Sequence, residues 1–104
     1  MKQTERIQMM EQHLDRAQQA INQLEKALQD YLPVRESIMT VSQYFGNDDW
    51  NQDHDDDKAG LLPQDLNRGV LSEDGIWNLL QDNRYLMIRL LEMVTDEVKN
   101  QFYI

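Results

Sequence analysis

Residues 44–77 read YFGNDDWNQDHDDDKAGLLPQDLNRGVLSEDGIW and separate two long segments whose residue patterns are helical. This middle stretch holds all four glycines and both tryptophans of the chain. Residues 46–60 alone contain six aspartates and one lysine, so they carry −5 of the formal net charge of −9. Glycine and aspartate favour turns and loops over helix interiors. We therefore predict an acidic loop and a connection over residues 46–71.

The connection is expected to act as a structural hinge or a ligand-binding hinge. Trp50 is the only large apolar residue in the acidic stretch, so it should anchor the loop on the core. Arg68 is expected to tie the loop to the connection by pairing with Asp65, Glu73 or an aspartate of the loop, although its guanidinium could instead hold an anionic ligand. Gly69 is expected to supply a positive φ angle. The aromatic residues are expected to close a small core beneath the loop, or else to form an aromatic pocket, and they are Tyr44, Phe45, Trp50 and Trp77. The predicted hinge residues are Trp50, Arg68, Gly69, Ser72 and Trp77.

A long helix is predicted over residues 4–32, where apolar residues alternate at spacings of three and four. This spacing is the heptad pattern of a coiled coil, with positions a and d apolar. Two interpretations remain open: the stripe packs on the protein's own helices, or it forms a seam between two chains. The a positions are Ile7, Leu14, Ile21 and Leu28, and the d positions are Met10, Ala17, Leu24 and Tyr31.

Two further helices are predicted. Pro33 either kinks the first helix or separates it from a shorter helix over residues 34–45. Ser72 is a suitable N-cap for a last helix over residues 73–100, with Leu71 and Ile76 placed for a hydrophobic staple. Nothing alternates with the period of a strand. The predicted fold is all-α: one domain over residues 1–104, a small bundle of two long helices and one shorter helix, with the acidic loop before the last helix.

The aspartates of the middle stretch are candidate metal ligands. Closely spaced carboxylates suit Ca²⁺ or Mg²⁺, which prefer oxygen ligands, and the candidates are Asp49, Asp53, Asp55 and Asp57. An EF-hand loop started at Asp49 fails, because His54 takes the glycine position and Gly60 takes the position of the bidentate glutamate. The competing interpretation is a solvated acidic loop without a cation, and we expect no other cofactor.

Composition excludes several classes of function. The chain has no cysteine, which excludes disulfides, thiol nucleophiles and cysteine-based zinc sites. Nineteen acidic residues against ten basic ones repel phosphate backbones, so we expect no nucleic-acid partner. No apolar run approaches the length of a membrane span, and the amino terminus lacks the apolar centre of a signal peptide. We therefore expect no membrane partner and a cytoplasmic location.

The middle stretch also resembles a known family. The resemblance extends over about residues 5–95 and is most specific over residues 60–74. The residues that carry it are Tyr44-Phe45, Asp49-Trp50, Asp53, Asp55, Asp57, Gly60-Leu61-Leu62-Pro63, Asp65-Leu66 and Arg68-Gly69-Val70-Leu71-Ser72-Glu73-Asp74. The family is catalogued as domain of unknown function 4298, and the resemblance implies a small soluble bacterial protein and no catalytic role.

These observations favour a non-enzymatic protein–protein interaction module, with a protein partner or a second copy of the chain as its ligand. Excess apolar helical surface on a small chain without a catalytic constellation supports this hypothesis. A homodimer through the first or the last helix is one form of it. Two alternatives remain: a divalent-cation-binding protein that uses the acidic loop, and a small acid–base enzyme.

Overall fold

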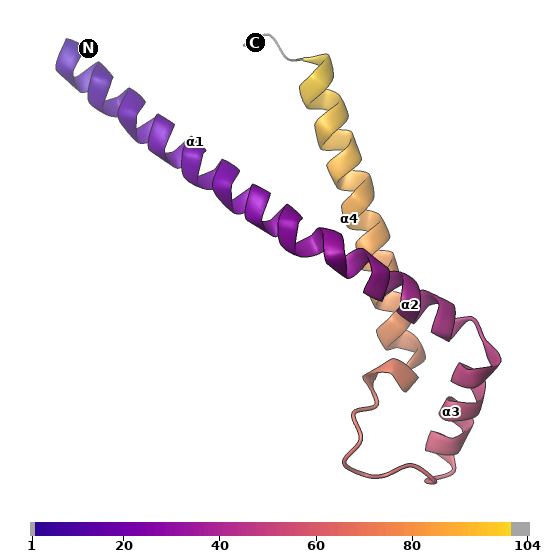
Figure 1. Ribbon diagram of the computed structural model, residues 1–104. Helices are drawn as coiled ribbons and strands as arrows, with labels where there is room; N and C mark the ends of the chain where they lie inside the picture. Colours follow the sequence, from indigo (N-terminus) through magenta and orange to yellow (C-terminus); the bar gives the residue numbers. More distant parts are fainter. Residues whose placement is uncertain (1, 101–104) are drawn as a thin grey trace. The chain divides into compact units, whose positions relative to one another are not determined.

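The computed structural model describes residues 2–100, and within them every regular element is helical (Figure 1). In chain order the elements are α1 (Gln3–Tyr31), the 3-10 turn η1 (Leu32–Val34), α2 (Arg35–Phe45), α3 (Asp48–Lys58), the 3-10 turn η2 (Gly69–Leu71) and α4 (Glu73–Lys99). The all-α prediction is confirmed. None of these helices is long and apolar enough to cross a membrane.

The backbone stays helical through Pro33. Leu32 donates its N–H to the carbonyl of Leu28 and so extends the hydrogen bonding of α1 by one residue. Arg35 then donates to the carbonyl of Leu32 across the three-residue turn η1. Proline has no N–H to donate, and near the start of a helical segment none is required. Pro33 therefore changes the helix type for three residues and does not end the helical backbone.

The chain divides into two compact units, Met1–Ser37 and Ile38–Ile104, where we expected a single domain. The first unit consists of α1, η1 and the start of α2, and α1 contains no buried residue. The second unit contains the rest of α2, α3, η2 and α4. It also contains all the core residues that the structure describes.

The predicted acidic loop is wrong over residues 48–58, because these residues form helix α3. The side chain of Asn47 caps the helix by accepting the N–H of Trp50 at 3.2 Å. Asp48 and Asp49 lie in its first turn and Lys58 in its last, where their charges complement the helix dipole. Capping and charge placement therefore compensate for the low intrinsic helix propensity of the aspartates.

The positive φ angle predicted for Gly69 belongs to Gly60, which has φ 73°. At Gly60 the backbone turns into the left-handed region and ends α3. Its N–H bonds to the carbonyl of Asp57 at 3.1 Å, and the N–H of Leu61 bonds to the carbonyl of Asp56 at 3.0 Å. These two bonds form a Schellman motif, a common helix end that satisfies the last carbonyls. Gly69 instead begins η2.

The start of α4 has the predicted cap and staple. Ser72 accepts the N–H of Gly75 at 3.3 Å through its side-chain oxygen. Leu71 and Ile76, on either side of the cap, are both buried and pack in one cluster with Trp50. This three-residue core is completed by partly buried side chains, which are Val41, Tyr44, Phe45, Leu62 and Leu80. The core therefore joins α2, α3, the connection and the first two turns of α4.

Candidate functional site

Trp50 fixes α3 against the start of α4. Its side chain is only 6% exposed, as its expected anchoring role requires. The indole Nε1–H donates to the backbone carbonyl of Val70 in η2 at 2.8 Å. The ring meets Phe45 edge-on at 5.0 Å between centroids and stacks on His54 at 4.8 Å. One side chain thus links α2, α3 and η2 through apolar packing and a buried hydrogen bond.

The inward face of α3 is largely polar. Trp50 is buried on it, and Asp53, His54 and Asp57 lie partly buried at the i+3, i+4 and i+7 positions. Residues at these intervals share one side of a helix. Each of the three polar side chains contacts a group in the core or the connection, so the face binds the rest of the unit without an apolar stripe.

Asp53 accepts a hydrogen bond from the hydroxyl of Tyr44 in α2 at 2.6 Å. This bond, with smaller contributions from burial and from the charges of Asp53 and Asp49, raises the pKa of Tyr44 to about 12. The neutral phenol donates the proton, so its ionisation would break the bond and place two negative charges together. The bond therefore holds α2 to α3, and it makes Tyr44 a weaker acid than a free tyrosine.

Arg68 links the end of α3 to the connection, which is the structural role expected of it. Its Nε lies 2.7 Å from the Oδ1 of Asp57. The angle is too poor for a hydrogen bond, so the attraction is mainly electrostatic. Its Nη2 donates to the backbone carbonyls of Leu62 at 3.3 Å and of Pro63. Arg68 therefore satisfies carbonyls of an irregular segment while it neutralises one of the aspartates.

The remaining two hinge residues differ from each other. Ser72 caps α4 as expected. Trp77 was expected to close the small core with Trp50, but its side chain is 56% exposed. Ile76 takes the inward position and is 2% exposed, and the next residue lies about 100° around the helix. The prediction that places Trp77 in the core is therefore wrong.

The four candidate metal ligands do not converge. On a helix, Asp55 points away from the side that carries Asp53 and Asp57. Asp53 is bonded to Tyr44, Asp57 is paired with Arg68, and Asp49 and Asp55 are exposed. Within residues 2–100, no group of three acidic or histidine side chains is arranged to hold a metal ion. The geometry gives the cation hypothesis no support, and Ca²⁺ or Mg²⁺ binding stays a prediction.

Glycine at position 75 is explained by a close backbone approach. A Cβ atom built on Gly75 would lie 2.8 Å from the carbonyl oxygen of Gly69, which is closer than real Cβ atoms come to other groups. Glycine in the first turn of a helix lowers its stability, so the sequence alone gives no reason for it. The reason is the tight packing of η2 across the start of α4.

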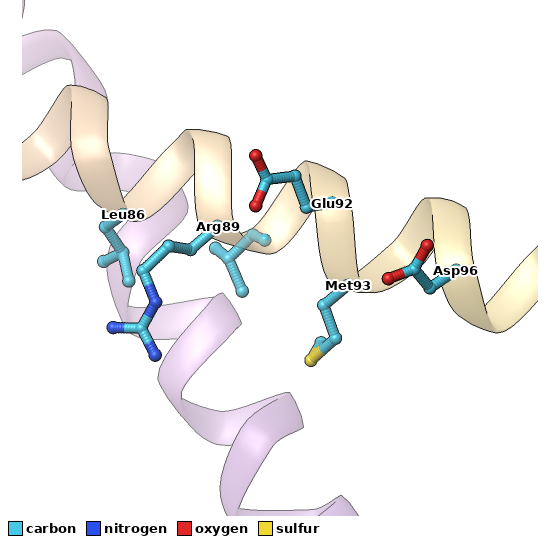
Figure 2. Close-up of a pocket in the computed structure, with 6 residues that line it drawn as sticks. Leu86, Arg89, Glu92, Met93 and Asp96 are labelled. Carbon is cyan, nitrogen blue, oxygen red and sulfur yellow. The ribbon is translucent and has the colours of Figure 1, made fainter.

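Beyond the core, α4 presents a shallow hollow and exposed apolar side chains. Figure 2 shows Leu86, Arg89, Glu92, Met93 and Asp96 along this part of the helix, and Leu90 completes the lining. All six residues come from α4, so within the second unit no other element closes the hollow. It mixes apolar and charged side chains, and it lacks the enclosure of a small-molecule site.

A long apolar stripe lies exposed on α1. Six large side chains at its a and d positions are each between 52% and 64% exposed: Ile7, Met10, Leu14, Ile21, Leu24 and Leu28. Within residues 2–37, α1 is accompanied only by η1 and the start of α2, which are too short to cover the stripe. The stripe runs through four heptads without a glycine or proline, so it is continuous.

A family model described as a domain of unknown function (DUF4298) matches residues 7–93 of the 104-residue chain. The chain belongs to this family. The match includes most of α1, the whole of α2, α3 and the connection, and α4 up to Met93. The resemblance seen in the sequence is thereby confirmed. No curated protein and no solved structure matches the chain.

Proposed function

We propose that this DUF4298 protein is a non-enzymatic protein–protein interaction module that self-associates through α1. The exposed heptad stripe of α1 carries the proposal. A helix without buried residues receives little stabilisation from packing, and most helices in proteins depend on the packing of one apolar face. A partner that covers the stripe would supply the missing packing.

The contacts around Trp50 support a structural role for α3 and the connection. Asp53 is bonded to Tyr44 of α2, Asp57 is paired with Arg68 of the connection, and the hydrogen bond to Asp53 raises the pKa of Tyr44 and so makes it less acidic. A general base requires the opposite arrangement, a group whose pKa lies near the working pH. The second unit therefore serves, in this proposal, as a compact body attached to an interaction helix.

The size of the stripe sets the expected affinity. Each of the six large side chains is about half exposed. Burying the exposed half of one side chain contributes roughly 1 kcal/mol, which is half the value for burying a whole side chain. A pair of helices would gain about 12 kcal/mol in this way. Association costs at least about 4 kcal/mol. The remainder corresponds to a dissociation constant no tighter than about micromolar.

Sedimentation equilibrium over roughly 1–500 μM protein, a range that brackets this affinity, tests the proposal. We expect the wild type to pass from monomer to dimer. Leu14→Asp, which places a charge in the stripe, should remain monomeric because each chain would have to bury a carboxylate in the apolar seam. Gln19→Asp adds the same charge on the opposite side of α1 and should dimerise like the wild type. A wild type that is monomeric throughout the series would refute the proposal.

A further inference from the structure

The residues that flank the stripe of α1 determine how two copies can pair. Heptad positions g and e lie on either side of the a and d seam and face the partner helix. In α1 the g positions are Arg6, His13, Ala20 and Ala27, and the e positions are Glu11, Gln18 and Glu25. The e side therefore carries two acids and the g side one base. Parallel and antiparallel pairs of α1 consequently place different charges opposite each other.

In a parallel pair in register, a g residue of one helix lies opposite the e residue five positions later in its partner. Arg6 then faces Glu11 of the second copy, and the symmetry of the pair makes this attractive contact twice. His13 faces Gln18, and Ala20 faces Glu25. No such pair combines two like charges.

In an antiparallel pair with full overlap, e residues face e residues and g residues face g residues. Ile7 would then lie level with Tyr31, and Glu11 would lie opposite Glu25 of the second copy, twice. Arg6 would gain no acidic partner, because no g position in α1 is acidic. The same sequence thus places like charges together in one orientation and opposite charges together in the other.

The apolar positions favour two strands. β-Branched residues at a combined with leucine at d are typical of two-stranded coiled coils, whereas isoleucine at d favours higher oligomers. In α1, two of the four a positions are isoleucine and two are leucine, Leu24 is at d, and no d position is isoleucine. Together with the flanking charges, this pattern selects a second copy of the chain as the occupant of the stripe.

We propose that two copies of the chain pair through α1 as a parallel, in-register, two-stranded coiled coil, with Arg6 of each copy against Glu11 of the other. This inference rests on the proposed self-association and specifies its geometry. Antiparallel pairing, or pairing through α4, would satisfy the proposed function and still contradict this geometry.

Cysteine cross-linking reads the orientation directly, because the natural chain contains no cysteine. Gln3 occupies the d position one heptad before Met10. A disulfide requires Cα atoms within about 7 Å, whereas the 29 residues of α1 extend for about 40 Å. In a parallel pair, Gln3→Cys should therefore oxidise to a covalent dimer under native conditions. The same variant carrying Leu14→Asp should not.

A mixture of Gln3→Cys and Arg35→Cys tests the opposite orientation. These two positions lie in one layer of the antiparallel pair and at opposite ends of the parallel one. A heterodisulfide between the two variants, without a Gln3→Cys homodimer, would overturn the parallel geometry and leave self-association standing. A dimer by sedimentation that forms neither cross-link uses another surface and also overturns the geometry. A monomer overturns both proposals.

Charge reversal gives a second measurement that does not depend on cysteine chemistry. Arg6→Glu turns two attractive contacts into two repulsive ones and should weaken dimerisation roughly tenfold, from about 0.7 kcal/mol for each pair. Adding Glu11→Arg restores opposite charges across the seam, so the double variant should recover the wild-type dissociation constant. Recovery supports the pairing. A double variant as weak as Arg6→Glu alone would contradict it.

Discussion

Replacing Trp50 by phenylalanine should destabilise the second unit far more than the same change at Trp77. Trp50 is buried and donates its indole N–H to Val70, whereas Trp77 is mostly exposed. Loss of the hydrogen bond costs about 1 kcal/mol, and it leaves the Val70 carbonyl without its partner. The smaller ring also leaves a void and weakens the contact with His54, which costs about 1–2 kcal/mol more.

The expected loss for Trp50→Phe is therefore about 2–3 kcal/mol in the free energy of unfolding, a large share of the total for a small domain. Trp77→Phe should stay within about 0.5 kcal/mol of the wild type. Urea unfolding followed by circular dichroism measures both, and each variant keeps one tryptophan as a fluorescent reporter. Equal losses in the two variants, or an unchanged Trp50→Phe, would refute the assignment of Trp50 as the anchor of α3.

Two further predictions concern the same unit. Because the hydrogen bond to Asp53 raises the pKa of Tyr44 to about 12, its stabilising effect is complete below the ordinary pKa of 10.0 and is lost as the pH rises through 12. The unfolding free energy should fall over this window in the wild type and fall less in Tyr44→Phe; identical pH profiles would contradict the role of the bond. Gly75→Ala should lose about 1 kcal/mol, because the clash with the Gly69 carbonyl outweighs the gain in helix propensity. Gly69→Ala, where a Cβ meets nothing within 4 Å, is the control, and a stabilised Gly75→Ala would show that the approach is not tight.

The sequence predicts the helices whose apolar residues recur at helical spacing. The heptads of α1 give its extent to within a residue at each end. Ser72 and the pair Leu71 and Ile76 identify the start of α4, because capping and stapling are local interactions between residues close in the chain. Features of this kind are visible in a sequence because the partners lie within one or two turns of each other.

Helix α3 was missed because its inward face is polar. Only Trp50 is apolar there. Asp53 and Asp57 are satisfied by Tyr44 and Arg68 from elsewhere in the chain, and His54 stacks on Trp50. Periodicity of apolar residues cannot reveal such a face. The end signals were present, since Asn47 is a strong N-cap and Gly60 a strong C′ residue.

The candidate site was only partly predictable for the same reason. The pairing of Arg68 with an aspartate follows from charge, but the choice of Asp57 depends on the helix that positions it. The position of the positive φ angle, at Gly60 and not at Gly69, depends on backbone direction at the connection. No single residue of the sequence specifies the direction of the backbone there.

Hydrogen–deuterium exchange as a function of protein concentration tests whether a second copy covers α1. We expect slow exchange across Ile7–Leu28 at high concentration and fast exchange on dilution below the dissociation constant. Amides around Trp50 and Ile76 should exchange at the same rate at both concentrations, since their protection arises within one chain. Protection of α1 that does not change on dilution would contradict the proposed self-association, because it would show that the chain covers the stripe by itself.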